Sequence, residues 1–167
     1  MGAPRDAIEQ ALRVATGIAG AGARRIPGWA TVELDRAARD LAVGVAVRSR
    51  DLSDDTLLGA RCRLVEAENR DEVLLLEPAT EGRLAASLAR FGEGPVALYF
   101  LAPADRFGEV IEELGRSGLV MSAEAPGPFG RERLVAGAPP GRLHLLIGED
   151  AANPPASPPT GAATIEP

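Results

Sequence analysis

The clearest indication of the fold is the segment Val73–Leu101, VLLLEPATEGRLAASLARFGEGPVALYFL. It begins with an apolar run that stops at Glu77-Pro78, which predicts a strand, because proline has no N–H to continue a ladder. Apolar residues at positions i, i+4 and i+7 over 84–91 predict a helix, and the glycine-rich turn at 92–94 leads into a second predicted strand over 95–101. The stretch therefore predicts a junction between two strand-rich halves, joined by one linking helix.

The second half continues with a helix and more strands. Asp105 is expected to cap a helix whose apolar residues share one face, and Gly118 is the expected end of that helix. Three strands, separated by proline- and glycine-rich turns, are then expected over 119–123, 133–136 and 143–147.

The first half shows the same order less clearly. A short strand is expected over 29–34, Asp35 is expected to cap a helix, and a turn-rich stretch at 51–55 precedes strands over 60–66 and 73–76. Each half thus runs strand, helix, strands. This order, repeated once, predicts an α+β fold made of two βαβββ modules rather than a doubly wound parallel sheet.

The two ends of the chain differ from this core. Residues 1–25 are expected to hold an N-terminal helix, over 4–24, and the proline-rich tail 151–167 is expected to be disordered. The domain between them, residues 26–150, divides into module 1 at about 26–82 and module 2 at about 92–150.

Composition excludes several classes of function. All 18 basic residues are arginine, which removes Schiff-base chemistry and the lysine of a phosphate-binding loop. A net charge of −6 without a basic stripe argues against nucleic acid as a partner, and no apolar stretch is long enough to predict a membrane span. With no secretory signal at the N-terminus, a cytoplasmic location is expected.

The single cysteine, Cys62, lies in a predicted strand between two arginines. A buried, inert thiol is the expected outcome, and a thiol made reactive by a lowered pKa is the alternative. A disulfide within the chain and a cysteine zinc site are both excluded.

The strand that ends at Pro78, the linking helix, the turn Gly92-Glu93-Gly94 and the strand Val96–Phe100 together resemble the middle of the vicinal oxygen chelate superfamily, to which glyoxalases, bleomycin resistance proteins and methylmalonyl-CoA epimerases belong. The resemblance covers about residues 28 to 149 and implies that the two modules form an open, cup-shaped barrel. It also implies a divalent metal held by four residues, one from each of four strands, through His, Gln and Glu side chains.

The positions that correspond to these ligands do not carry them. The first falls on Gly28-Trp29-Ala30, the second on Leu74 and the third on Ala97. The fourth falls on Leu145 or, with a gap of one residue, on His144. At most one ligand of four remains, and one imidazole cannot hold a catalytic ion. We therefore expect neither a metal nor another cofactor.

Three residue types are candidates for catalysis. Tyr99 shares the strand face of Ala97 and could bind or protonate an anionic intermediate, whereas a core tyrosine with a satisfied hydroxyl is the alternative. His144 could be a general base if it faces the cup, and is a surface residue if Leu145 does. Glu33, placed on a predicted strand, could abstract a proton.

Four residues complete the expected site, with Tyr99 and His144 as further ligand contacts. Glu77 is a second strand carboxylate that could abstract a proton. Trp29 could stack on a flat ligand or fill the core. Arg131 and Arg133 could hold a carboxylate or phosphate through their guanidinium forks, or lie in a solvated turn.

Three function hypotheses follow. The first is a metal-independent protein that binds a small molecule in its cup, as related antibiotic-sequestering proteins do. The second is a divergent enzyme of glyoxalase, epimerase or lyase type that transfers protons with side chains. The third is a structural or interaction protein with a filled pocket. An open cup favours the first two and a filled cup the third. A homodimer is also expected, because an unpaired edge strand invites association.

Overall fold

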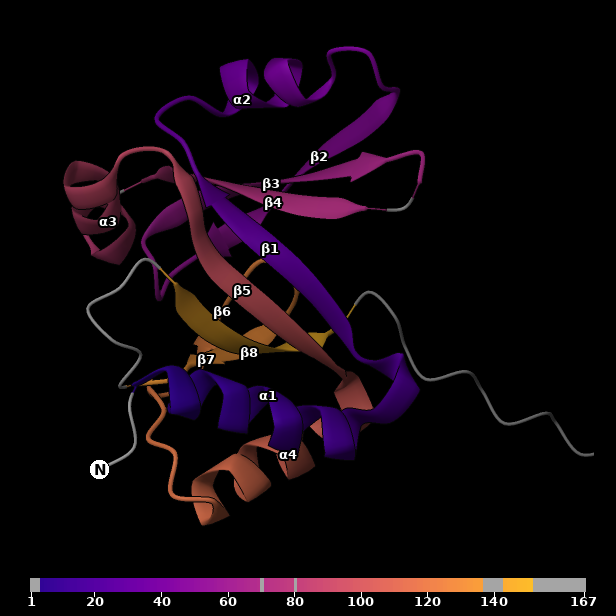
Figure 1. Ribbon diagram of the computed structural model, residues 1–167, viewed down its shortest axis with the longest axis vertical. Helices are drawn as coiled ribbons and strands as arrows, with labels where there is room; N and C mark the ends of the chain where they lie inside the picture. Colours follow the sequence, from indigo (N-terminus) through magenta and orange to yellow (C-terminus); the bar gives the residue numbers. More distant parts are fainter. Residues whose placement is uncertain (1–3, 70, 80, 137–142, 152–167) are drawn as a thin grey trace, which may run out of the picture.

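The computed structural model describes residues 4–69, 71–79, 81–136 and 143–151 (Figure 1). The strands are β1 (Arg24–Ala30), β2 (Val47–Asp55), β3 (Ala60–Ala67), β4 (Glu72–Pro78), β5 (Gly94–Pro103), β6 (Ala125–Pro126), β7 (Arg131–Leu134) and β8 (His144–Asp150). The helices are α1 (Pro4–Ala19), α2 (Leu34–Leu41), α3 (Arg83–Phe91) and α4 (Ala104–Arg116), and a short 3-10 helix, η1 (Gly20–Gly22), follows α1.

The strands form one eight-stranded sheet in the order β2-β3-β4-β1-β5-β8-β7-β6. In each half the first strand pairs in parallel with the last, β1 with β4 and β5 with β8, and the two first strands pair antiparallel at the centre. This repeated arrangement confirms the predicted α+β fold of two βαβββ modules.

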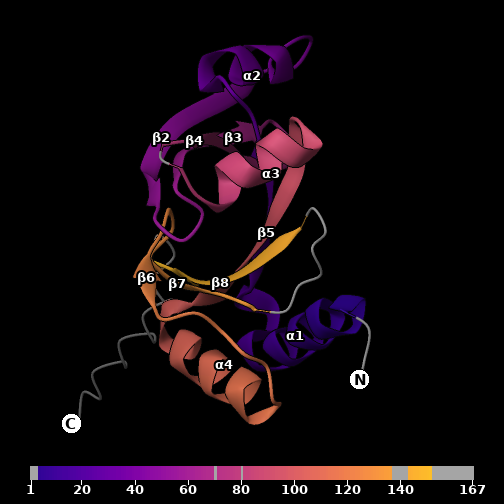
Figure 2. The same cartoon turned by 90° about the vertical axis from the view of Figure 1, so that its left-hand side faces the viewer.

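The sheet curls so that its two halves lie one above the other, with α2 outside one half and α1 and α4 outside the other (Figure 2). Phe107, Val110 and Leu114 bury one side of α4 against the convex face of module 2, together with the small residues Ala11 and Ala15 of α1. A separate cluster under α2 covers the convex face of module 1. The concave face between the halves has its own apolar core, which takes residues from both modules.

Helix α3 lies over the concave face of the sheet. Its Leu84 is fully buried in the concave cluster, and Leu88 packs against the same cluster. The spacing of these leucines predicts one apolar side of a helix but does not say which face of the sheet receives it.

Helix α4 ends where the sequence predicts. The Leu119 N–H donates to the Leu114 carbonyl at 3.1 Å and the Gly118 N–H donates to the Gly115 carbonyl at 3.0 Å. Gly118 has a φ of +82°, which suits glycine because it has no Cβ.

Several boundaries differ from the prediction. The first strand begins at Arg24 and ends at Ala30, since pairing with β5 holds the weak strand formers Pro27 and Gly28 in place. Residues 51–55 belong to strand β2 and are not a turn, because an edge strand can expose charged side chains. In place of the strand expected over 119–123 there is a single bridge between Met121 and Val135.

The predicted helix caps are also wrong. Asp35 and Asp105 lie within the first turns of α2 and α4. The N-cap positions are occupied by Glu33 and Pro103, and neither side chain makes a capping hydrogen bond. Glu77 Oε2 instead accepts a hydrogen bond from the Leu34 N–H at 2.9 Å, so the first turn of α2 is satisfied from β4.

The N-terminal helix ends at Ala19, five residues earlier than predicted. Residues 152–167, which hold nearly all of the tail predicted to be disordered, lie outside the described residues. Among the described residues, no helix has both the length and the apolar character needed to cross a membrane.

Candidate functional site

Four residues form a row across the four central strands on the concave face. Gly28 of β1 stands next to Leu74 of β4 and next to Ala97 of β5, and Ala97 stands next to His144 of β8. Neighbouring residues in register point to the same face of a sheet. The row Leu74–Gly28–Ala97–His144 therefore occupies the positions at which the superfamily resemblance implies metal ligands.

The residues of this row do not fit a metal. Leucine, glycine and alanine offer no side-chain donor, and His144 alone supplies one nitrogen. A Cβ added at Gly28 would lie 2.9 Å from Ala97 Cβ, 3.1 Å from Leu76 Cδ1 and 3.2 Å from Tyr99 Cε2. The space that a ligand side chain would need is already filled by its neighbours. Within the described residues, no group of three or more His, Cys, Asp or Glu could hold an ion.

His144 faces the concave side, which is one of the two orientations that the sequence left open. Leu146, two residues along β8, lies in the concave cluster, whereas Leu145 lies in the cluster under α1 and α4. His144 is half-buried, and its Nε2 lies 3.3 Å from the Ser87 hydroxyl of α3. Burial first, and then the positive charge of Arg83, lower the pKa of His144, so its ring is neutral at pH 7.

A buried polar cluster, Asp55–Tyr99–Glu132, lies in the same interior. Tyr99 has no exposed surface, and its hydroxyl donates to Asp55 Oδ2 at 2.5 Å. Burial first, and then the charge of Asp55, hold the pKa of Tyr99 well above its usual value. The Tyr99 hydroxyl is thus a satisfied core group, which is the alternative that the sequence left open for it.

Glu132 completes this cluster from β7. Burial first, and then the nearby Asp55, raise the pKa of Glu132 to about 9, so it is protonated at neutral pH and hydrogen-bonds to Asp55. A Cβ on Gly127 would overlap the Glu132 carboxyl group, which shows how closely the β6–β7 turn is packed over it.

The turn after β2 explains why Asp55 is buried. Asp55 Oδ1 accepts a hydrogen bond from the Leu58 N–H at 2.7 Å, and its carbonyl accepts one from the Gly59 N–H at 2.9 Å. The turn also reaches the other module, because the Thr56 hydroxyl donates to the Pro126 carbonyl at 2.8 Å. The edges of the two modules therefore meet at this end of the cup.

Apolar side chains of both modules also lie in this interior. The Phe129 ring meets the Tyr99 ring edge to face, with centroids 5.9 Å apart. Leu58, Leu64 and Leu74 have no exposed surface.

The other predicted site residues lie elsewhere. Trp29 alternates with the inward-facing Gly28 and Ala30 and is 44% exposed, so it neither lines nor fills the cup. Glu33 is not on a strand; it precedes α2 and forms long ion pairs with Arg36 and Arg39, both 3.9 Å.

Arg131 and Arg133 flank the inward-facing Glu132 on β7 and point away from the concave face. Arg131 lies over the Phe107 ring at 5.2 Å and pairs with Glu149 at 2.9 Å. Arg133 donates to the Ser122 carbonyl at 3.3 Å. The five predicted ligand contacts, Trp29, Tyr99, Arg131, Arg133 and His144, do not meet in one site.

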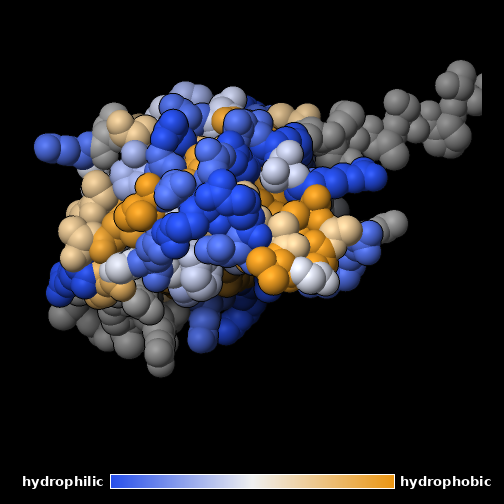
Figure 3. All heavy atoms as spheres, turned by 90° about the horizontal axis from the view of Figure 1, so that it is seen from above, coloured by the Kyte–Doolittle hydropathy of each residue, from blue (hydrophilic) through white to orange (hydrophobic). Residues whose placement is uncertain are grey.

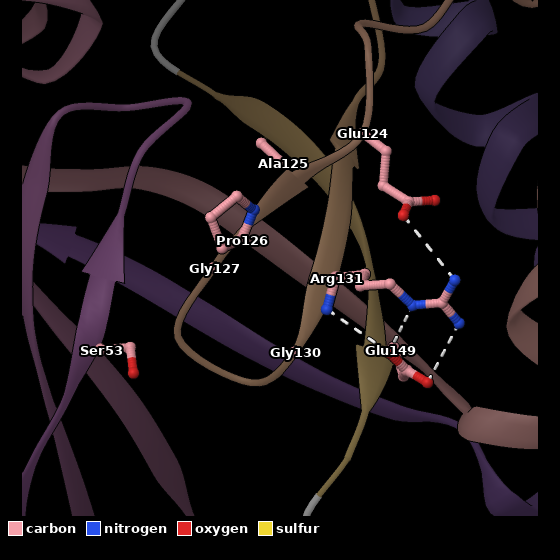
Figure 4. Close-up of a pocket in the computed structure, with 8 residues that line it drawn as sticks. All are labelled: Ser53, Glu124, Ala125, Pro126, Gly127, Gly130, Arg131 and Glu149. Carbon is pink, nitrogen blue, oxygen red and sulfur yellow. Dashed lines mark hydrogen bonds and ion pairs between the residues drawn. The ribbon is translucent and has the colours of Figure 1, made fainter.

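Arg131 does line a surface hollow of about 420 Å³ at the edge of the sheet (Figure 4). Its wall includes Ser53 of β2, the β6–β7 turn, and the carboxylates Glu124 and Glu149 on either side of Arg131. Both carboxylates pair with Arg131, so its guanidinium is largely neutralised within the protein.

Cys62 is buried in β3, as expected. Burial raises the pKa of its thiol far above its usual value, and the negative charge of Asp55 acts in the same direction. The thiol therefore remains protonated and unreactive in the folded protein.

Sequence reasoning missed Asp55, Ser87 and Glu132. Asp55 stood at the end of a polar stretch taken for a turn, and Glu132 stood between two arginines. The only available signal in the sequence was the alternation of side chains along β7, which points Glu132 to the opposite face of the sheet from Arg131 and Arg133.

The chain is similar to solved structures of known proteins. A methylmalonyl-CoA epimerase from Mycobacterium tuberculosis has a TM-score of 0.66 at 18% identity, over 75% of this chain and 86% of that chain. A hypothetical protein from Bacillus halodurans C-125 has a TM-score of 0.62 at 17% identity, over 76% and 94%. A variant of the Streptomyces coelicolor methylmalonyl-CoA epimerase, solved in complex with 2-nitronate-propionyl-CoA, has a TM-score of 0.56 at 19% identity, over 74% and 94%.

No protein-family model matches the chain, and no curated protein matches it. At these identities the structural similarity establishes the fold alone. The repeated modules, the strand order and these neighbours agree, and the chain has the fold of the vicinal oxygen chelate superfamily.

Proposed function

We propose that this protein carries out no metal-assisted chemistry and acts as an interaction protein, through its surface. The observation that supports this proposal is the close packing of the described side chains at the centre of the concave face. Tyr99 is fully buried and its hydroxyl is bonded to Asp55, so neither is free to contact a ligand. The space beside Gly28, where a first metal ligand would stand, holds Ala97, Leu76 and Tyr99.

The proposal is tested with the substrate class of the structural neighbours. The protein is incubated with methylmalonyl-CoA in deuterated water, without added metal and with Zn, Ni, Co, Mn or Fe ions in turn. We expect no deuterium at the α carbon beyond the rate in buffer. We also expect no rise in melting temperature with any ion, because an ion that does not bind the native state cannot stabilise it. Metal-dependent exchange that is lost in His144→Ala would overturn the proposal.

A second candidate function is small-molecule binding, which one observation favours. His144 is half-buried rather than fully buried, and it lies beside the Ser87 hydroxyl, with the exposed Arg83 on the same helix. A neutral imidazole, a hydroxyl and a nearby guanidinium can together contact a small carboxylate.

Calorimetry separates the two candidates. A panel of carboxylates and CoA thioesters is titrated into the wild type, His144→Ala and the surface control Arg13→Ala. Under the leading proposal none of the three gives a binding heat. Binding by the wild type and Arg13→Ala that is lost in His144→Ala would favour the second candidate instead.

The homodimer predicted from the sequence belongs to the same proposal, as does the cytoplasmic location. A protein that acts by binding a partner needs an exposed surface to which that partner can bind. One end of the sheet is a long strand, β2, whose outer edge has no partner strand in the described part of the chain.

A further inference from the structure

We propose that Ser87 and His144 form a serine–histidine dyad that hydrolyses esters of small acyl groups. The inference goes beyond the proposed surface function, because it gives a reaction to the place where a small carboxylate is the second candidate's ligand. The Ser87 hydroxyl oxygen of α3 lies 3.3 Å from Nε2 of His144 on β8. A serine within hydrogen-bond reach of a histidine base is the arrangement that activates the hydroxyl as a nucleophile.

His144 is in the protonation state that a general base needs. Burial first, and then the positive charge of Arg83, lower its pKa, so the ring is neutral at pH 7. With its one proton on Nδ1, the ring leaves Nε2 to accept the proton of the Ser87 hydroxyl. Asp55 acts on the pKa in the opposite direction, and its negative charge favours the imidazolium that forms when the serine loses its proton.

A positive charge stands beside the dyad. Arg83 precedes Ser87 by four residues on α3, and side chains at this spacing are neighbours on a helix. Arg83 forms no hydrogen bond or ion pair within the part of the chain that the structure describes, so no carboxylate there neutralises its guanidinium. The guanidinium can therefore stabilise the oxyanion of a tetrahedral intermediate formed at Ser87.

The surroundings of Ser87 suit a small acyl group. Leu84 and Leu88 of α3 pack on the concave cluster, so apolar side chains bound the site on its inner side. Ala86 and Ala89 of the same helix are exposed, and their short side chains leave part of the half-buried serine within reach of solvent. Seen from above, apolar residues gather on the side of the molecule where α3 lies (Figure 3). A short apolar acyl chain therefore fits this place better than a charged one.

The reaction balances with water as its only co-reactant. The Ser87 oxygen attacks the carbonyl carbon of the ester, and its proton passes to His144 Nε2. The electron pair of the carbonyl double bond moves to oxygen, and when it returns, the bond to the leaving oxygen breaks and that oxygen takes the proton from His144. Water then attacks the acyl-serine, and His144 accepts the water proton and returns it to Ser87. The products are one carboxylic acid and one alcohol.

The test uses p-nitrophenyl acetate and a fluorophosphonate that labels activated serines. The wild type should release p-nitrophenol faster than buffer does, and its peptide mass spectrum should show the phosphonate on Ser87. Ser87→Ala should lose the label and slow the protein-dependent hydrolysis by about a hundredfold or more, and His144→Ala should slow it similarly although its serine is intact. Ser49→Ala, which removes an exposed hydroxyl from β2, is the matched control and should behave as the wild type.

Two results would overturn the proposal. One is a wild type that takes no label at Ser87, a result that needs no variant and so holds even if a substituted chain does not fold. The other is hydrolysis that persists in Ser87→Ala and is lost in His144→Ala, since the imidazole would then attack the ester directly. Neither result would touch the proposed lack of metal chemistry, which depends on the deuterium exchange assay.

Discussion

The buried cluster Asp55–Tyr99–Glu132 makes a sharp prediction about stability and pH. The pKa of Glu132 is raised from 4.5 to about 9 by burial and by Asp55, so the folded state holds a proton that the unfolded state releases above pH 4.5. Its contribution to stability is therefore greatest at low pH and is lost as the pH rises toward 9. The loss is about 1.4 kcal/mol per pH unit within this window.

The substitution Glu132→Gln should remove this dependence. Glutamine is neutral at every pH and keeps the shape of the protonated acid, and its amide can donate to Asp55 as the acid does. Between about pH 7 and about pH 8.5 the free energy of unfolding of the wild type should fall by about 2 kcal/mol more than that of the variant.

This pH range avoids the other titrating groups. The lowered pKa of His144 affects stability below its unfolded value of 6.5, and the lowered pKa values of Asp51, Glu93 and Glu149 act at lower pH still. The raised pKa of Cys62 acts above its unfolded value of 9.0.

The assay is urea unfolding followed by far-ultraviolet circular dichroism at several pH values. The control is Glu68→Gln, on the exposed turn after β3, which should keep the pH slope of the wild type. Equal slopes for the wild type and Glu132→Gln would refute the protonated Glu132 and the argument built on it.

Three further predictions follow from the same interior. Gly28→Ala should destabilise the protein by about 1 to 3 kcal/mol in urea unfolding, since its Cβ would meet Ala97 at 2.9 Å, whereas Gly17→Ala in α1, with nothing within 4 Å, should not destabilise it. Tyr99→Phe should cost about 1 to 3 kcal/mol of unfolding free energy, because it removes a donor from the buried Asp55, and an unchanged urea midpoint would contradict the bond. Cys62 should resist a thiol reagent at about pH 8 in the native state and react fully in urea, and rapid native labelling would contradict its burial.

The fold could be predicted where the sequence is apolar. The strands around Leu64, Leu75 and Phe100 are buried, so hydrophobic runs of strand length marked them correctly. Strand β2 carries charges because it is an edge, and its composition indicated a turn instead. The first strand was placed too late because Pro27 and Gly28 are strand residues only through pairing with β5 and, for Gly28, also with β4.

The candidate site could be predicted only in part. The superfamily resemblance assigned ligand positions to Leu74 and Ala97, and the structure brings both into one row on the concave face. The choice between His144 and Leu145 needed the pairing of β5 with β8. The contact of Asp55 with Glu132 joins two modules. It forms because the sheet curves, and no local pattern in the sequence predicts that curvature.

The row without ligands and the filled interior are parts of one arrangement. Glycine at position 28 leaves room for Tyr99 and Leu76 to close over the centre of the sheet. A tyrosine buried there needs an acceptor for its hydroxyl, and Asp55 supplies it. A carboxylate in an apolar interior is costly, so a second acid beside it is stable only when protonated, and Glu132 meets that condition. A single substitution at Gly28 therefore cannot restore a metal site, because the incoming side chain would have to displace Tyr99 and leave Asp55 without its donor.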